Sequence, residues 1–170
     1  MSLIEILAVI GIIGFVIYQQ FAGQFLRGKR LIVLPAVLTV VGFFDLRGHH
    51  LSPADITWIA AGAAGSLAIG LAFGLMTRLE ARDGVLWGKL PLHALWLWAA
   101  MIAWRVVIMV IAARMGAHVA ASTSPLLFTL GLNRVGQAAV ITLRAMASGI
   151  PFAPEKNGRT FLGGGQRAGY

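Results

Sequence analysis

The stretch that decides the fold is residues 56–76, ITWIAAGAAGSLAIGLAFGLM, which contains no charged residue. A bilayer core about 30 Å thick is crossed by roughly 20 apolar residues in a helix, so this stretch predicts a membrane-spanning helix. Small residues recur along it every four positions, at Gly62, Ser66, Gly70 and Gly74. This spacing puts them on one helix face, where a second backbone can approach closely. The face favours packing inside a helical bundle, and a homodimer seam is the alternative.

Four further apolar stretches surround this one: Leu3–Phe21, Leu31–Leu46, Leu90–Ala113 and Pro125–Ile150. Two of them leave an alternative open. The second stretch is short and contains Pro35, so we expect it either to cross the membrane or to re-enter it from one side. The last carries Arg134, Gln137 and Arg144 at helical spacing, which also fits an amphipathic helix lying on the membrane surface.

The composition excludes most soluble classes of protein. Of the 170 residues, 58% are apolar and 12% are charged, and the mean hydropathy is +0.82. Soluble domains carry about 25% charged residues. The absence of cysteine excludes disulfides, thiolate zinc sites and thiol catalysis. The net charge of +8 is then better explained by membrane topology than by binding of nucleic acid.

Basic residues indicate the orientation in the membrane. With five crossings and the N-terminus outside, ten basic residues lie on the inner side and two on the outer side. The inner ones are Arg27, Lys29, Arg30, Arg78, Arg82, Lys89, Arg144, Lys156, Arg159 and Arg167, and the outer ones are Arg47 and Arg114. Cytoplasmic loops are rich in Lys and Arg, so this distribution favours five crossings, N-out and C-in. If residues 125–150 lay on the membrane surface, six basic residues would lie on the inner side and seven on the outer side, and the charges would favour neither orientation.

The sequence thus predicts an all-α, polytopic helical bundle with about five spans. Residues 1–150 form a single transmembrane domain, and residues 151–170, rich in glycine and charge, form a flexible cytoplasmic tail. The lipid bilayer is the first expected partner, and a bacterial inner membrane is the expected location.

Two arginines are expected within the membrane. Arg105 and Arg134 both lie roughly 12–14 Å below the outer surface, at 1.5 Å per residue. A charge at that depth is costly, so we expect it to be compensated. No Asp or Glu occurs between Asp83 and Glu155.

Three interpretations of these arginines follow. The first is a structural ion pair with Glu5 or Asp45, such as Arg105 with Asp45. The second is an anion-binding site in which Arg105 and Arg134 bind the ligand and Asn133 and Gln137 donate hydrogen bonds. The third is that the side chains extend to the membrane surface without a partner.

The sequence contains no recognisable catalytic, metal-binding or cofactor-binding motif. His49, His50 and Asp55 could bind a metal, but a solvated loop is the simpler interpretation because no further ligand has suitable spacing. Residues 77–89 contain the turn signal Asp83-Gly84 and are interpreted as a short solvated connection, with contact to anionic lipid head groups or a cytoplasmic partner as the alternative.

The segment from Ile56 through Arg105 resembles the CcdC-like family of small bacterial integral membrane proteins. A small-residue helix is followed by RLEARDGVLWGK, residues 78–89, and then by a helix carrying Trp104-Arg105. The positions that match the family pattern are Arg78, Glu80, Arg82, Gly84, Lys89 and Arg105. The resemblance covers about the central third of the chain. It implies a multi-span membrane protein and little about mechanism.

Two functions are expected from these features. The first is a non-catalytic accessory or scaffold protein of the bacterial inner membrane, bound to another membrane protein or to a second copy of itself. The second is a small transporter or anion-binding membrane protein that uses Arg105 and Arg134. No cofactor and no nucleic acid is expected in either case, and an intramembrane enzyme lacks a visible nucleophile and base.

Overall fold

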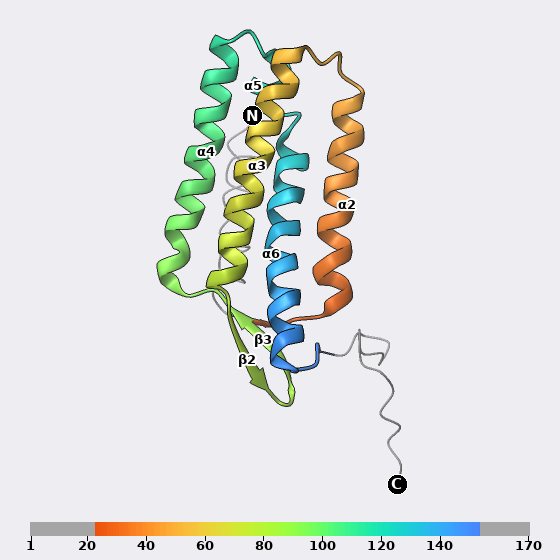
Figure 1. Ribbon diagram of the computed structural model, residues 1–170, viewed down its shortest axis with the longest axis vertical. Helices are drawn as coiled ribbons and strands as arrows, with labels where there is room; N and C mark the ends of the chain where they lie inside the picture. The colour runs from red at the N-terminus through yellow and green to blue at the C-terminus, as the bar shows by residue number, and fades with distance from the viewer. Residues whose placement is uncertain (1–22, 154–170) are drawn as a thin grey trace, which may run out of the picture.

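The computed structural model describes residues 23–153, which form an up-and-down bundle of four long helices (Figure 1). The helices are α2 (Gly28–Arg47), α3 (Pro53–Met76), α4 (Leu95–Arg114) and α6 (Leu126–Ser148). Their order across the bundle is α4, α3, α6, α2, so α3 and α6 lie in the middle (Figure 1). A single turn of 3₁₀-helix, η1 (Leu92–Ala94), precedes α4, and a short helix, α5 (His118–Ala121), lies between α4 and α6.

Three of the five expected spans are confirmed as helices long and apolar enough to cross a membrane. They are α3, α4 and α6, with η1 extending the α4 span at its start. The second expected span, Leu31–Leu46, forms the 20-residue helix α2 beside α6 but does not meet the same criterion. The basic residues at both ends of α2 shorten its apolar part. The first expected span, Leu3–Phe21, lies outside the described residues.

Local signals set the helix ends. Ser52 and Asp55 form a reciprocal capping box at the start of α3, and Pro53 occupies the first helical turn, where it loses no intrahelical hydrogen bond. Gly149 follows α6 with φ 68°, a left-handed conformation that glycine adopts without a steric cost and that ends many helices.

A small antiparallel sheet closes one end of the bundle, which corrects the expectation of an all-α fold. Strands β2 (Arg78–Arg82) and β3 (Val85–Lys89) form a hairpin, and β1 (Gln24–Phe25) pairs with the other edge of β3. Asp83 and Gly84 have φ of 52° and 74°. Positive φ at both central residues of a two-residue loop is the geometry that matches the twist of the paired strands. The expected solvated connection is therefore an ordered hairpin.

The folded part continues past the expected boundary at residue 150. The amide of Leu86 donates to the carbonyl of Pro151 at 2.8 Å, and the amide of Ala153 donates to the carbonyl of Leu26 at 3.0 Å. Phe152 is buried in a cluster with Leu26 and Leu86 beneath the sheet. The remainder of the expected tail, residues 154–170, lies outside the described residues.

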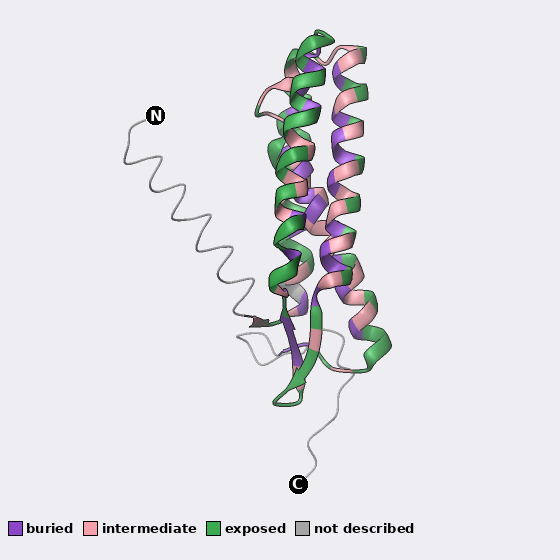
Figure 2. Cartoon of the chain, turned by 90° about the vertical axis from the view of Figure 1, so that its left-hand side faces the viewer, coloured by how far each residue is buried: buried purple, intermediate pink, exposed green. Residues whose placement is uncertain are grey.

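Glycines bring the central helix α6 close to α2 as well as to α3. A Cβ placed on Gly42 of α2 would lie 2.3 Å from the backbone nitrogen of Phe128, and one on Gly131 would lie 2.5 Å from the Thr39 hydroxyl oxygen. Buried residues lie on the helix faces that pack against one another, whereas the outward faces are exposed (Figure 2). The outward faces carry large apolar side chains, as expected where lipid rather than water surrounds a bundle.

Candidate functional site

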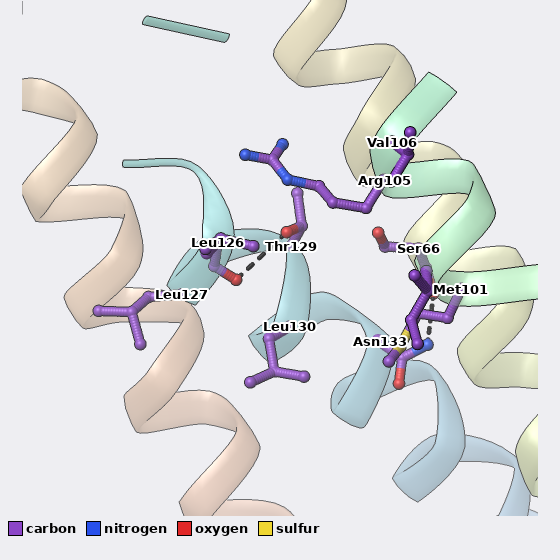
Figure 3. A pocket seen from close by; sticks show the side chains of 10 residues that line it. Ser66, Met101, Arg105, Val106, Leu126, Leu127, Thr129, Leu130 and Asn133 are labelled. Carbon is purple, nitrogen blue, oxygen red and sulfur yellow. Dashed lines mark hydrogen bonds between the residues drawn. The ribbon is translucent and has the colours of Figure 1, made fainter. Parts of the chain in front are cut away.

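A cavity of about 350 Å³ lies between α3, α4 and α6 and contains one of the two predicted intramembrane arginines (Figure 3). Its walls are mostly apolar. The lining residues are Ser66 of α3, Met101, Ile102, Arg105 and Val106 of α4, and Leu126, Leu127, Thr129, Leu130 and Asn133 of α6. Volumes of this size fall in the range of small-molecule sites, about 300–1,000 Å³.

Arg105 extends from α4 across one end of this cavity, above Thr129 (Figure 3). The guanidinium Nη2 donates a hydrogen bond to the backbone carbonyl of Ser122, in the connection that leads from α5 to α6. Between residues 23 and 153 the structure contains one ion pair, Arg82 with Glu80 at 3.6 Å, so Arg105 has no carboxylate partner in that part of the chain.

The predicted ion pair of Arg105 with Asp45 does not form. Asp45 is exposed near the end of α2, and α2 and α4 lie at opposite sides of the bundle with α6 and α3 between them (Figure 1). The outward reach of the Arg105 side chain therefore does not bring it to Asp45. The other predicted carboxylate partner, Glu5, lies outside the described residues.

The four residues predicted to bind an anion separate into two pairs. Arg105 and Asn133 line the cavity, whereas Arg134 and Gln137 are not among its lining residues. Arg134 donates to the Gln137 side-chain oxygen at 2.8 Å, and its guanidinium carbon lies 5.9 Å from the centre of the Trp98 ring. Because Trp98 is in the first turn of α4 and Ser122 lies beyond its last turn, the two arginine side chains extend toward opposite ends of that helix.

Asn133 also holds α6 against α3. Its side chain is only 2% exposed, and its amide Nδ2 donates to the backbone carbonyl of Ser66 at 2.9 Å. Hydrogen bonds between helices that involve asparagine are a recurrent means of association in membranes. Asn133, predicted to donate to a ligand, therefore also has a role between helices.

The small-residue face of α3 packs inside the chain. A Cβ on Gly70 would lie 2.0 Å from the carbonyl oxygen of Asn133, and one on Gly74 would lie 2.8 Å from that of Gln137. On the part of the face nearer α4, a Cβ on Gly62 would lie 3.5 Å from the Ile108 side chain. The small-residue face therefore packs against helices of the same chain, which is the first of the two roles expected for it.

Asp55 lies at the end of the bundle opposite the hairpin and has a structural role that was not predicted from the sequence. Its carboxylate is buried and accepts hydrogen bonds from the Ser52 hydroxyl and amide, at 2.7 and 3.1 Å, and from the amides of Val119 and Ala120, both at 2.9 Å. Asp55 thus joins the start of α3 to α5. The signal was present as the capping pattern Ser52-Pro53-Ala54-Asp55.

Arg144 is a second missed residue, at the hairpin end. Its Nη1 lies within hydrogen-bonding distance of the carbonyls of Gly74, Leu75 and Thr77, at 2.8, 2.9 and 2.7 Å. The last carbonyls of a helix have no intrahelical partner and carry partial negative charge. A guanidinium at this position donates hydrogen bonds to these carbonyls and also neutralises their charge. No local sequence signal identifies this contact, because it depends on which helix lies beside α6.

Residues 23–153 contain no group of three potential metal ligands. His49 and His50 are exposed, and the Asp55 carboxylate that could have joined them is occupied by its four hydrogen bonds. What the site offers chemically is a guanidinium at one end of an apolar cavity, which is suited to holding an anionic group.

No family model matches this chain, and no curated protein or solved structure matches it either.

Proposed function

We propose that this protein is a non-catalytic integral membrane protein that assists or scaffolds a larger assembly in a bacterial inner membrane. Three polar side chains inside the bundle support this proposal, because they serve contacts between structural elements. Asn133 bonds α6 to α3, Arg144 caps α3 from α6, and the Trp104 ring nitrogen donates to the Gly62 carbonyl at 3.3 Å.

The charge distribution supports an N-out, C-in orientation with the hairpin in the cytoplasm. Basic residues at the hairpin end are Arg27, Lys29, Arg30, Arg78, Arg82, Lys89 and Arg144, whereas the opposite end has Arg47 and Arg114. Lys and Arg accumulate on the cytoplasmic side of membrane proteins. In this proposal α2 is a further crossing, because it lies along α6 and presents an apolar outward face.

The observation that carries the accessory role is the exposed face of α4. Among the long helices of the described part, α4 packs mainly against α3, whereas α6 packs against both α2 and α3. The rest of α4 is a broad apolar and aromatic surface that includes Trp96, Ile102, Val107 and Val110. Helices of this kind associate with other membrane helices through close packing. We propose another membrane protein, or a second copy of this chain, as the partner of this face.

Site-specific photo-crosslinking in intact cells tests this role. A photoreactive residue at Val107 or Val110 should capture the same protein from both positions, and one at Val40, on the outward face of α2, should not. A product at twice the chain mass of 18.1 kDa identifies a second copy, and any other single mass identifies a different partner. Adducts with lipid alone at both α4 positions, or the same capture from Val40, would contradict the proposal.

A second candidate function is that of a small transporter or anion-binding membrane protein. The cavity beside Arg105 supports it, although Arg134 is not among the residues that line this cavity. The test is anion binding, and transport in vesicles, by the double variant Arg105→Leu with Arg134→Leu. We expect both activities to be lost, and the single Arg105→Leu variant should already lose most of the binding. Unchanged binding and transport in the double variant would exclude this function.

We also propose a relation to the CcdC-like family. The supporting residues are Arg78, Glu80, Arg82, Gly84 and Lys89, which all belong to the β2–β3 hairpin, and Arg105, in α4. Alignment of further sequences that share this hairpin pattern would test the relation.

A further inference from the structure

The cavity has one polar end and a long apolar body. Arg105 lies at the end nearest Ser122, and the hydroxyl of Thr129 beside it is already bonded to the Pro125 carbonyl at 2.9 Å. Below these residues the walls are Met101 and Leu130, with Asn133 at the far side (Figure 3). Ile102 also lines the cavity. A ligand that fills this space therefore meets a charge at one end and mostly apolar side chains along the rest, with Ser66 and Asn133 as further polar residues.

The Arg105 guanidinium is free to take a further acceptor. A guanidinium carries five N–H donors, and within residues 23–153 that of Arg105 makes one hydrogen bond, to the Ser122 carbonyl. That carbonyl is neutral, and no carboxylate from the same residues reaches the guanidinium. A cation in an apolar environment gains most from an anionic partner that forms charge-assisted hydrogen bonds.

The guanidinium is directed toward the end of the bundle opposite the hairpin. Arg105 is in the middle of α4, but its side chain extends to Ser122, in the connection at the end of the bundle opposite the hairpin. Long basic side chains bring their charge toward the membrane interface in this way. The apolar body of the cavity then lies at the depth of the acyl chains.

The mouth of the cavity is formed by apolar side chains that are exposed on the outside of the bundle. Ile102 and Val106 of α4 and Leu126, Leu127 and Leu130 of α6 all line the cavity and are all exposed. A molecule dissolved in the bilayer can enter past these residues without crossing a polar surface.

We infer that the cavity binds an acidic lipid of the surrounding bilayer, with its anionic head group on Arg105 and part of one acyl chain along Ile102 and Leu130. A soluble anion would gain one cation and lose its hydration against apolar walls. An acidic lipid gains the same cation and buries hydrocarbon as well. The inference deepens the second candidate function and rests on it, because it names the class of anion that the Arg105 site takes.

Native mass spectrometry of the purified full chain in detergent tests the inference. The probes are phosphatidylglycerol as the acidic lipid, phosphatidylcholine as the zwitterionic lipid, and inorganic phosphate. We expect selective retention of phosphatidylglycerol, no competition by inorganic phosphate, and roughly tenfold weaker retention in Arg105→Gln, as for loss of a charged hydrogen-bonding group. Arg105→Lys should keep part of the binding because the charge remains.

Matched variants separate the site from general effects of charge and bulk. Arg114→Gln removes the same charge from an exposed position of α4, and Leu143→Trp enlarges an exposed position of α6 away from the cavity. Both should bind like the unmodified chain, whereas Leu130→Trp should block the acyl-chain part and reduce binding even though Arg105 is kept. Equal losses in the matched controls, or equal retention of phosphatidylcholine, would overturn the inference.

The outcomes also distinguish the inference from the function on which it rests. Arg105-dependent binding of inorganic phosphate without selectivity for the acidic lipid would overturn the lipid assignment and keep the anion-binding function. No Arg105-dependent binding of either anion would overturn both.

Discussion

Helix α3 meets its two neighbours in different ways. Toward α6 the contact is between backbones. A Cβ on Gly70 would lie 2.0 Å from the Asn133 carbonyl oxygen, and one on Gly136 of α6 would lie 2.8 Å from the Leu67 carbonyl oxygen. Toward α4 the contact is between a smooth surface and large side chains, because Gly62 and Gly65 face Ile108 and Trp104.

The difference shows that a row of small residues does not by itself set how closely two helices pack. Where the partner helix also presents glycine, as α6 does at Gly136, the two backbones approach each other from both sides. Where the partner presents tryptophan and isoleucine, these side chains occupy the space between the backbones. The cavity beside Arg105 lies between α4 and the close pair of α3 and α6. The close contact between α3 and α6 thus forms one wall of the cavity, and the wider contact between α3 and α4 leaves room for a ligand.

The largest expected effect is that of Gly70→Ala. The added methyl group meets a backbone oxygen that cannot move without shifting α6, so the free energy of unfolding should fall by about 3 kcal/mol, the upper range for overpacking. Gly62→Ala is the matched control on the same helix, since its Cβ has ordinary contact with Ile108 at 3.5 Å. We expect it to be neutral or to stabilise slightly, because alanine favours a helix over glycine.

Reversible unfolding in mixed detergent micelles, followed by circular dichroism, measures both variants. Equal losses of stability in Gly70→Ala and Gly62→Ala would show that the two sides of α3 are packed alike and would remove the basis of the comparison.

An intermediate effect is expected for Arg144→Met, which tests how α6 is bonded to α3 at the end of the bundle that carries the hairpin. The substitution keeps much of the apolar stem and removes the donor to the carbonyls of Gly74, Leu75 and Thr77. We expect a loss of about 2 kcal/mol, typical of a charged hydrogen-bonding group.

The same unfolding measurement applies, with Arg78→Met as control, because Arg78 is an exposed cation at the same end of the bundle. Arg144→Lys should recover only part of the stability, since an ammonium cannot reproduce the planar donor geometry. A loss in Arg78→Met as large as that in Arg144→Met would indicate a general charge effect.

The smallest effects are expected from the hydrogen bonds that α3 receives on its two sides. Asn133→Leu removes the 2.9 Å bond from α6 to the Ser66 carbonyl and should cost about 1 kcal/mol, within the range measured for such bonds in membranes. Trp104→Phe removes the longer bond, 3.3 Å, from α4 to the Gly62 carbonyl and should cost no more than about 0.6 kcal/mol. A larger loss of stability in Trp104→Phe than in Asn133→Leu would show that the α3–α4 interface depends more on its hydrogen bond than the α3–α6 interface does, contrary to this comparison.

Mostly apolar runs of membrane-spanning length predicted the long helices because length and hydropathy are local properties. The stretches 56–76, 90–113 and 125–150 correspond to α3, to η1 with α4, and to α6. The start of α3 was placed at Ile56 instead of Pro53 because the capping residues before it are polar, although they belong to the helix end. Asp83-Gly84 also carried enough information for a hairpin, since this pair between two short strands favours that turn.

The order of helices across the bundle could not be predicted from one sequence. The pairing of Arg105 with Asp45 assumed that an arginine reaching outward would meet the carboxylate at the outer end of a neighbouring helix, and the arrangement separates α4 from α2. The same limit applies to Arg144, whose acceptors are defined only once α6 lies beside the end of α3. Within the candidate site, the sequence identified Arg105 and Asn133 but not the apolar walls, because these are drawn from two helices, α4 and α6, that are separated in the sequence.

The β1–β3 pairing has a consequence for how the bundle comes apart. Leu26, just before α2, donates its amide to Leu86 at 3.0 Å and accepts the amide of Ala153, just after α6. Fraying normally starts at chain boundaries, where backbone groups are unpaired. Here the residues just before α2 and just after α6 are both bonded to the same hairpin, so neither the start of α2 nor the end of α6 can fray before these hydrogen bonds break.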